Sequence, residues 1–222
     1  MASSIEEVSK ILDGVGWGRY QVCTFFVLGL CWCNMLAWQA CISISLQEAS
    51  SQWGLSSIQI GGIGSCHTFG ILIGSYFWGY LGNTKGRLIT LKLVFTINAC
   101  IGLLYTCAIN YAMLCISAIL IGFCGGGAQV LSGTLYMESL PSNKQWTLVL
   151  LTIFISIGGI LGYLIAIIVE ASGTHSINIW RWVGGFDILL MITTAGLLFT
   201  IFESPKFLIC QKNEESSELV LR

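Results

Sequence analysis

Polar side chains recur at helical spacing inside three long apolar segments of the sequence. Thr152 and Ser156 are four residues apart and Tyr163 follows seven residues later, so the three fall on one helical face. A polar group in a membrane helix faces a cavity or a partner helix, because lipid offers it no hydrogen bond. These stripes are therefore candidates for the lining of a cavity, with ordinary hydrogen bonding between helices as the alternative. The candidates are Asn34, Trp38, Gln129, Ser132, Tyr136, Thr152, Ser156 and Tyr163.

Two titratable side chains also lie within apolar segments. His67 could carry a coupled proton, although an intramembrane histidine is more often neutral and hydrogen-bonded to a neighbouring helix. Asp187 lies five residues past Trp182, about 7.5 Å into the last apolar segment. At that shallow depth we expect the carboxyl to bond a neighbour or to meet water at the outer end of the segment.

The inventory of reactive groups argues against an enzyme. A metal site needs several ligands, whereas His67 is the only histidine in an apolar segment, and the sequence has no P-loop. Nine of the ten cysteines fall in apolar runs without the paired spacing of a zinc site or a disulfide framework. We expect no catalytic residue, no metal and no cofactor.

The composition is that of a membrane protein. Apolar residues make up 55% of the chain, charged residues only 9%, and the mean hydropathy is +0.81. A soluble domain would carry about 25% charged residues, so a water-exposed surface could not be built from this chain. The net charge of −1 argues against a nucleic-acid partner.

Six segments are long and apolar enough to span a bilayer, since about 20 residues cross roughly 30 Å of hydrocarbon. They are residues 21–46, 58–81, 89–109, 112–137, 146–170 and 182–203. Because lipid cannot satisfy backbone polar groups, each must be a helix. The expected fold class is an all-α six-helix bundle over residues 21–205, between an N-terminal segment 1–20 and a tail 206–222. Only residues 108–111 mark the turn between the third and fourth segments.

The charges of the connecting loops predict the orientation. With six crossings both termini share one side, and nine of the ten Lys and Arg residues fall there, against Arg181 alone on the other. Basic residues concentrate on the cytoplasmic side of membrane proteins. We expect a multi-pass protein with both termini and the loop around residues 83–87 in the cytoplasm.

Small residues at packing spacing predict close contacts between helices. Gly70 and Gly74 form one GxxxG pair and Gly158 and Gly162 form another. The cluster of three glycines at 125–127 lies in a further segment, where it would let two backbones approach closely.

The loop after the second segment reads GYLGNTKGR over residues 79–87. It resembles the signature that joins helices two and three in the major facilitator superfamily, with Asn83 where the family has Asp. In this reading Gly79 allows tight packing and Gly86 permits a sharp turn. The positive loop charges, Lys85 and Arg87, lie on the cytoplasmic side, where Arg87 can pair across helices.

Further segments resemble sugar-porter and synaptic vesicle 2-related transporters. They are WRW at 180–182, ESPKF at 203–207, YMESLP at 136–141 and GWGRYQ at 16–21. Two of them carry an acidic residue at a cytoplasmic helix end. We expect Glu138 and Glu203 to form ion pairs with loop cations such as Arg87 or Lys144.

The resemblance implies a function and a partner. Members have twelve helices in two bundles that rock around a midplane site, and this chain resembles the N-terminal bundle. The expected function is transport of a small organic solute across a lipid bilayer by alternating access, with a second six-helix bundle as partner. The alternative is a truncated family member that does not transport and acts as a scaffold or binding partner.

Overall fold

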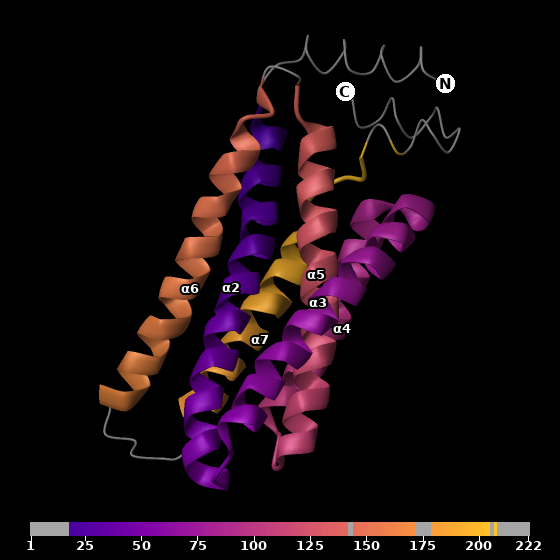
Figure 1. Ribbon diagram of the computed structural model, residues 1–222. Helices are drawn as coiled ribbons and strands as arrows, with labels where there is room; N and C mark the ends of the chain where they lie inside the picture. The colour runs from indigo at the N-terminus through magenta and orange to yellow at the C-terminus, as the bar shows by residue number, and fades with distance from the viewer. Residues whose placement is uncertain (1–17, 142–143, 172–178, 205–206, 208–222) are drawn as a thin grey trace.

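The computed structural model describes residues 18–141, 144–171, 179–204 and 207, which form six helices and no strand. The helices are α2 (Arg19–Trp53), α3 (Ser57–Lys85), α4 (Arg87–Thr106), α5 (Tyr111–Ser139), α6 (Thr147–Ala171) and α7 (Ile179–Leu197). They pack lengthwise into one bundle, so the predicted all-α fold class is confirmed (Figure 1). The first turn of α2, the α3–α4 junction and the end of α7 all lie toward the same end of the bundle.

Local sequence signals set the helix ends. Gly54 adopts a left-handed conformation, with a φ of 61°, and stops α2. Ser56 then caps α3, accepting a hydrogen bond from the backbone N–H of Gln59 at 3.4 Å. In the short turn before α5, the Asn110 side chain accepts a hydrogen bond from the Met113 N–H at 2.8 Å. The turns between α2 and α3 and between α4 and α5 therefore each have a side-chain cap that satisfies an exposed helix N–H group.

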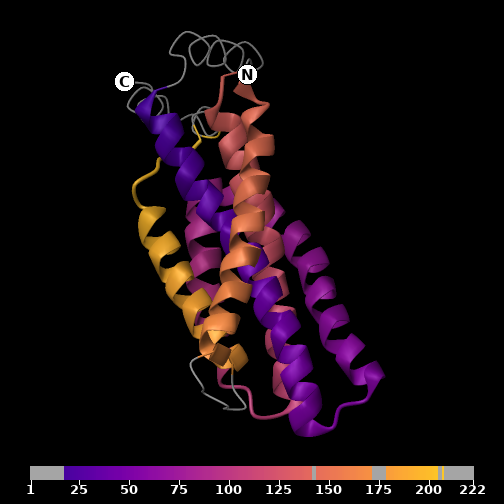
Figure 2. The same cartoon turned by 90° about the vertical axis from the view of Figure 1, so that its left-hand side faces the viewer.

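The first and last helices differ most from the segments expected from hydropathy. Helix α2 has 35 residues, so it is about 52 Å long and exceeds the thickness of the hydrocarbon core. Figure 2 shows it running obliquely across its neighbours. Helix α7 ends at Leu197, before the expected residue 203. The chain that follows leaves the helix, which lets Glu203 bond the start of α4.

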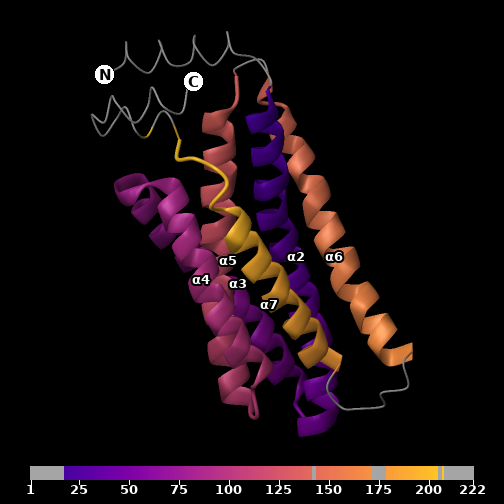
Figure 3. The same cartoon turned by 180° about the vertical axis from the view of Figure 1, so that it is seen from behind.

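Four of the described helices are long and apolar enough to cross a membrane: α2, α4, α5 and α6. The other two are less apolar for visible reasons. Helix α3 is rich in glycine, serine and other polar residues, and α7 carries Arg181 and Asp187 within 19 residues. Both lie beside the four apolar helices in the same bundle (Figure 3).

Helices α3 and α5 make the closest backbone contact in the bundle through two interlocked glycine pairs. A methyl group added at Gly70 or Gly74 would lie 2.1 or 1.9 Å from a carbonyl oxygen of α5. One added at Gly122 or Gly126 would lie 2.1 or 2.3 Å from a carbonyl oxygen of α3. Only glycine is compatible with that separation, because any Cβ would overlap the facing backbone.

A second close contact joins α6 to α2. A methyl group at Gly158 would lie 2.0 Å from the carbonyl oxygen of Cys33 on α2, and one at Gly162 would lie 2.9 Å from Cβ of Ala40. The glycine cluster of α5 does not act as one unit: Gly126 packs against α3, whereas Gly125 has no atom within 4 Å of an added methyl.

These two adjacent glycines give a matched test of the α3–α5 contact. Gly126→Ala should destabilise the bundle by about 1–3 kcal/mol, because the added methyl forces the two backbones apart. Gly125→Ala should stay within about 1 kcal/mol of the wild type, since alanine is the better helix former and meets open space. The midpoints of thermal unfolding in detergent measure both. Equal losses from the two variants would contradict the close-contact interpretation.

Candidate functional site

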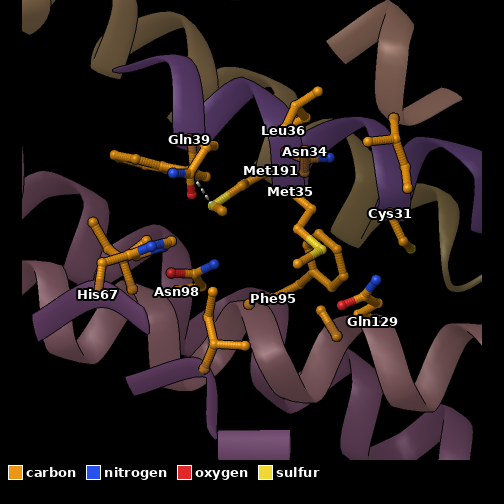
Figure 4. Close-up of a pocket in the computed structure, with 16 residues that line it drawn as sticks. Cys31, Asn34, Met35, Leu36, Gln39, His67, Phe95, Asn98, Gln129 and Met191 are labelled. Atoms are coloured by element: carbon orange, nitrogen blue, oxygen red, sulfur yellow. Dashed lines mark hydrogen bonds between the residues drawn. The ribbon is translucent and has the colours of Figure 1, made fainter. Parts of the chain in front are cut away.

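A cavity of about 220 Å³ lies inside the bundle and is lined by residues from all six described helices. Figure 4 shows Asn34 and Gln39 on α2 across the cavity from His67, Asn98 and Gln129 on α3, α4 and α5. Aromatic and apolar side chains complete the lining, among them Trp38, Phe95, Ile121, Ile155 and Met191. No Asp, Glu, Lys or Arg is among the described lining residues, so this wall binds through amide groups, one imidazole and ring faces.

Three of the predicted cavity residues line this space: Asn34, Trp38 and Gln129. The Asn34 amide donates to the hydroxyl of Thr194 on α7 at 2.9 Å, while its carbonyl oxygen is buried without a described partner. The Trp38 indole N–H points to the sulfur of Met191 at 3.2 Å. Both side chains are therefore held from α7, which fixes the α2 wall of the cavity.

Two other candidates join helices and do not line the cavity. The Ser132 hydroxyl accepts a hydrogen bond from the Trp32 indole at 3.0 Å and donates to the Ala128 carbonyl at 2.5 Å. The Tyr136 hydroxyl lies 3.0 Å from that of Thr147 at the start of α6. These two residues thus form hydrogen bonds between helices, which was the alternative to cavity lining.

The predicted stripe on α6 lies on the outside of the bundle. Thr152, Ser156 and Tyr163 are exposed, and 49% of the Tyr163 side chain is accessible. The glycine face of α6 packs on α2, so this polar face is turned away from α2. Within the described residues, α6 contributes Ile155 to the cavity.

Sequence reasoning missed two polar cavity residues, Gln39 and Asn98, and gave His67 another role. Gln39 and Asn98 are single amides in apolar stretches, and neither belongs to a stripe of polar residues. Asn98 is the one amide side chain of α4, which was the available signal. His67 was expected to bond a neighbouring helix, whereas its ring borders the cavity beside Asn98 (Figure 4).

Arg87 holds together the loop motif of residues 79–87 through its side-chain contacts. Its guanidinium lies 2.9 Å from the Glu138 carboxylate at the end of α5 and 3.3 Å from the Asn83 side-chain oxygen. Both members of the ion pair are largely buried, with 19% and 21% of their side chains exposed. Because Asn83 is neutral, Glu138 supplies the countercharge of Arg87. Lys85 is exposed.

Glu203 bonds a helix terminus where an ion pair with a loop cation was expected. Its carboxylate accepts hydrogen bonds from the backbone N–H groups of Arg87 and Leu88, both at 3.0 Å. Free N–H groups and the helix dipole make the start of a helix a favourable site for a carboxylate. Gly86 has a φ of 106°, and a methyl group there would lie 2.8 Å from the Glu203 carboxylate. Glycine thus serves both the turn and the approach of Glu203.

Solved structures of the xylose transporter XylE share this fold. The proton:xylose symporter bound to 6-bromo-6-deoxy-D-glucose gives a TM-score of 0.83 at 23% identity, covering 91% of this chain and 49% of that one. The partially occluded inward-open form from E. coli gives 0.84 at 22% identity, covering 92% and 54%. At such identities the likeness shows the fold alone.

Curated relatives match nearly the whole chain. An uncharacterized MFS-type transporter of Schizosaccharomyces pombe is 25% identical over 224 residues, covering 93% of this chain and 40% of the relative. The synaptic vesicle 2-related protein of Xenopus laevis is 27% identical over 216 residues, covering 97% and 38%. The organic cation/carnitine transporter 7 of Arabidopsis thaliana is 27% identical over 220 residues, covering 96% and 42%. The chain thus spans about two fifths of the length of these relatives.

The family model described as sugar (and other) transporter matches residues 24–222. This match, the MFS-type relatives and the XylE fold agree with the loop motif and with the six-helix bundle. The chain belongs to the sugar (and other) transporter family of the major facilitator superfamily and has the fold of its N-terminal six-helix half.

Proposed function

We propose that this chain forms one wall of a transporter that moves a small organic solute across a membrane by alternating access. The observation that carries the proposal is the cavity, which gathers Asn34, Gln39, His67, Asn98 and Gln129 from four helices around apolar ring faces. Binding sites for small molecules combine an apolar lining with a few convergent polar groups in this way. This wall offers no countercharge, so it suits a solute that is neutral where it touches these residues.

The exposed polar face of α6 supports a second bundle as partner. Ser156 and Tyr163 would be unfavourable against lipid, because their hydroxyl groups lose hydrogen bonds to water there. Thr152 is satisfied within its own helix, where its hydroxyl donates to the Val149 carbonyl at 2.6 Å. A second six-helix bundle, carried by a longer chain or supplied by a copy of this one, would cover that face. Alternating access then consists of one bundle rocking against the other around the cavity.

The first prediction from this proposal tests whether a second bundle covers the polar face of α6. In mild detergent this chain should form a dimer with a second copy of itself. The double variant Ser156→Leu, Tyr163→Leu should shift the population to monomers, since the polar contacts of the α6 face are lost. Thr193→Leu, an exposed threonine on α7, should leave pairing unchanged. Mass measurement of the detergent-solubilised protein gives the oligomeric state, and liposome uptake of a panel of sugars and organic ions gives the activity. A well-folded monomer that moved any of these solutes would contradict the two-bundle proposal.

The second prediction concerns orientation. The start of α2, the α3–α4 junction and the stretch before α6 lie toward one end of the bundle, and the start of α7 lies toward the other (Figure 1). In the sequence the first three segments carry Arg19, Lys85, Arg87 and Lys144, and the start of α7 carries Arg181. We propose that the first end is cytoplasmic, because basic residues are retained on that side.

Cysteine labelling of intact cells tests the orientation, in a background without the exposed cysteines Cys23, Cys100 and Cys107 and without Cys210. Ser51→Cys should react with an impermeant maleimide from outside. Asn83→Cys should react only after permeabilisation. The reverse pattern would place the motif loop outside and refute the assignment.

The third prediction concerns the Arg87–Glu138 ion pair, which joins the α3–α4 junction to α5. Arg87→Ala and Glu138→Ala should each lower the free energy of unfolding by about 1–3 kcal/mol, because each leaves a largely buried charge without its partner. The double variant should cost no more than either single one, since the two residues act as a unit. Lys85→Ala, in the same loop but exposed, is the control.

Thermal unfolding and labelling at Ser51→Cys and Asn83→Cys separate two roles for this pair. If it holds one conformation of the transporter, Arg87→Ala changes accessibility at both positions more than it lowers the unfolding temperature. Additive losses in the double variant, with unchanged accessibility, would show that the loop is only a turn.

A further inference from the structure

The middle of α7 carries a carboxyl group that the transport site does not use. Asp187 lies eight residues from the start of α7 and ten from its end, which places it about 12 and 15 Å from the two ends. The side chain is 0% exposed. Neither the expected bond to a neighbour nor the expected contact with water is seen for this carboxyl among the described residues.

Neither oxygen of this carboxyl has a hydrogen-bond partner among the described residues. A buried carboxylate without a partner is among the most unfavourable groups in a protein. Inside a membrane-spanning bundle little water is available to solvate its charge. A neutral carboxylic acid in the same place is far less costly, because it carries no net charge. Burial and the lack of a partner thus select the protonated form.

No described cation is in a position to balance the charge. Arg181 lies on the same helix, but its guanidinium donates to the Ala108 carbonyl at 3.0 Å and stacks over the Trp180 ring at 5.2 Å. Lys92 on α4 lies over the Phe199 ring beyond the far end of α7.

The remaining titratable groups that face Asp187 are neutral or acidic. Helix α2 presents the buried thiols of Cys33 and Cys41, and α4 presents the buried phenol of Tyr105, which is bonded to Ser45. Glu48 on α2 lies at the start of α7, where it accepts from the Trp180 N–H at 3.4 Å, and Glu170 lies in the last turn of α6. None of these groups supplies a positive charge.

The carboxyl also lies beside the cavity. Helix α7 packs between α4 and α2 (Figure 3), and Met191, one turn beyond Asp187, lines the cavity and meets the Trp38 indole. The side-chain oxygens of Asn34 and Asn98, on α2 and α4, are likewise buried without a described partner. The helices that meet at α7 thus bury three side chains with unpartnered acceptor oxygens, Asp187, Asn34 and Asn98, a setting that favours a bound proton.

We propose that Asp187 is a proton-binding site: its carboxyl holds a proton while α7 is packed on α2 and α4, and gives it to water when these helices separate. Proton release and helix separation are then linked, so each promotes the other. The inference deepens the proposed function by naming the proton as the coupled ion. Only the coupling to solute transport rests on that function; the proton site itself does not.

Infrared absorption tests the protonation state directly. At pH 7 the wild type in lipid vesicles should show the carbonyl stretch of a protonated carboxyl, which Asp187→Asn should lack. Exposed carboxyls are ionised at this pH and do not contribute. Carbon-13 labelling of the aspartate side chains should shift the same band in the unaltered protein, so the assignment does not depend on how the variant folds. Absence of a shifted band would mean an ionised Asp187 and would overturn the proposal.

Alkylation of a native thiol tests the link to helix separation. Cys41 is fully buried on α2, and its thiol donates to the Trp180 carbonyl at 3.4 Å, so it reacts only when α7 moves away. The maleimide rate at Cys41, followed by peptide mass, should rise with pH more steeply in the wild type than in Asp187→Asn. The ratio of the wild-type rate to the Asp187→Asn rate should grow by up to about tenfold per pH unit, as expected for one released proton.

A ratio independent of pH would refute the link even if the infrared band were present. The link would also be refuted if the ratio rose with pH at the exposed Cys100 but not at Cys41, because Cys100 lies outside the contact. Neither measurement involves solute, so failure of the transport assays and failure of the proton site are distinguishable.

Discussion

The close contact of α3 with α5 is the constraint on which the rest of the bundle depends. Four glycines let each backbone press against carbonyl groups of the other, at a separation that no other residue tolerates. The hydrophobic effect does not drive helices together in lipid, because the lipid tails are as apolar as the side chains. Close van der Waals packing therefore has to supply the attraction. Once these two helices are locked, the position of Gly125 is fixed at the cavity, and so are His67 on α3 and Gln129 on α5.

The cytoplasm-facing end proposed here is held by polar contacts of a different kind. Glu203 caps the start of α4 after the chain has left α7, and Arg87 ties the same junction to Glu138 on α5. Four helices are thereby connected through one turn at Gly86. A carboxylate on free N–H groups and a largely buried ion pair are strong interactions, yet both can be broken by a small displacement of the loop. They fit the proposed alternating access, in which this end of the bundle would be held in one state and released in the other.

The interior shows how a chain with 9% charged residues uses the few polar groups it buries. Most are satisfied by a backbone carbonyl one turn away, as Ser117 and Ser139 are, and these need no functional explanation. The amides of the cavity and the carboxyl of Asp187 are different, because some of their oxygens have no described partner. Unsatisfied acceptors inside a bundle are sites where a proton, water or solute is bound most favourably.

The sequence by itself determined the membrane environment, the six helices, the family and the residues that shape the turns. Those conclusions rest on local properties: apolar runs, caps such as Asn110, and the Gly86–Arg87 motif. The tertiary structure decided which polar residues meet. Helical spacing put Thr152, Ser156 and Tyr163 on one face correctly, but whether that face points inward depends on how α6 is rotated by its glycine contact with α2. Likewise the depth and isolation of Asp187 follow from where α7 starts and what packs against it, which no local pattern records.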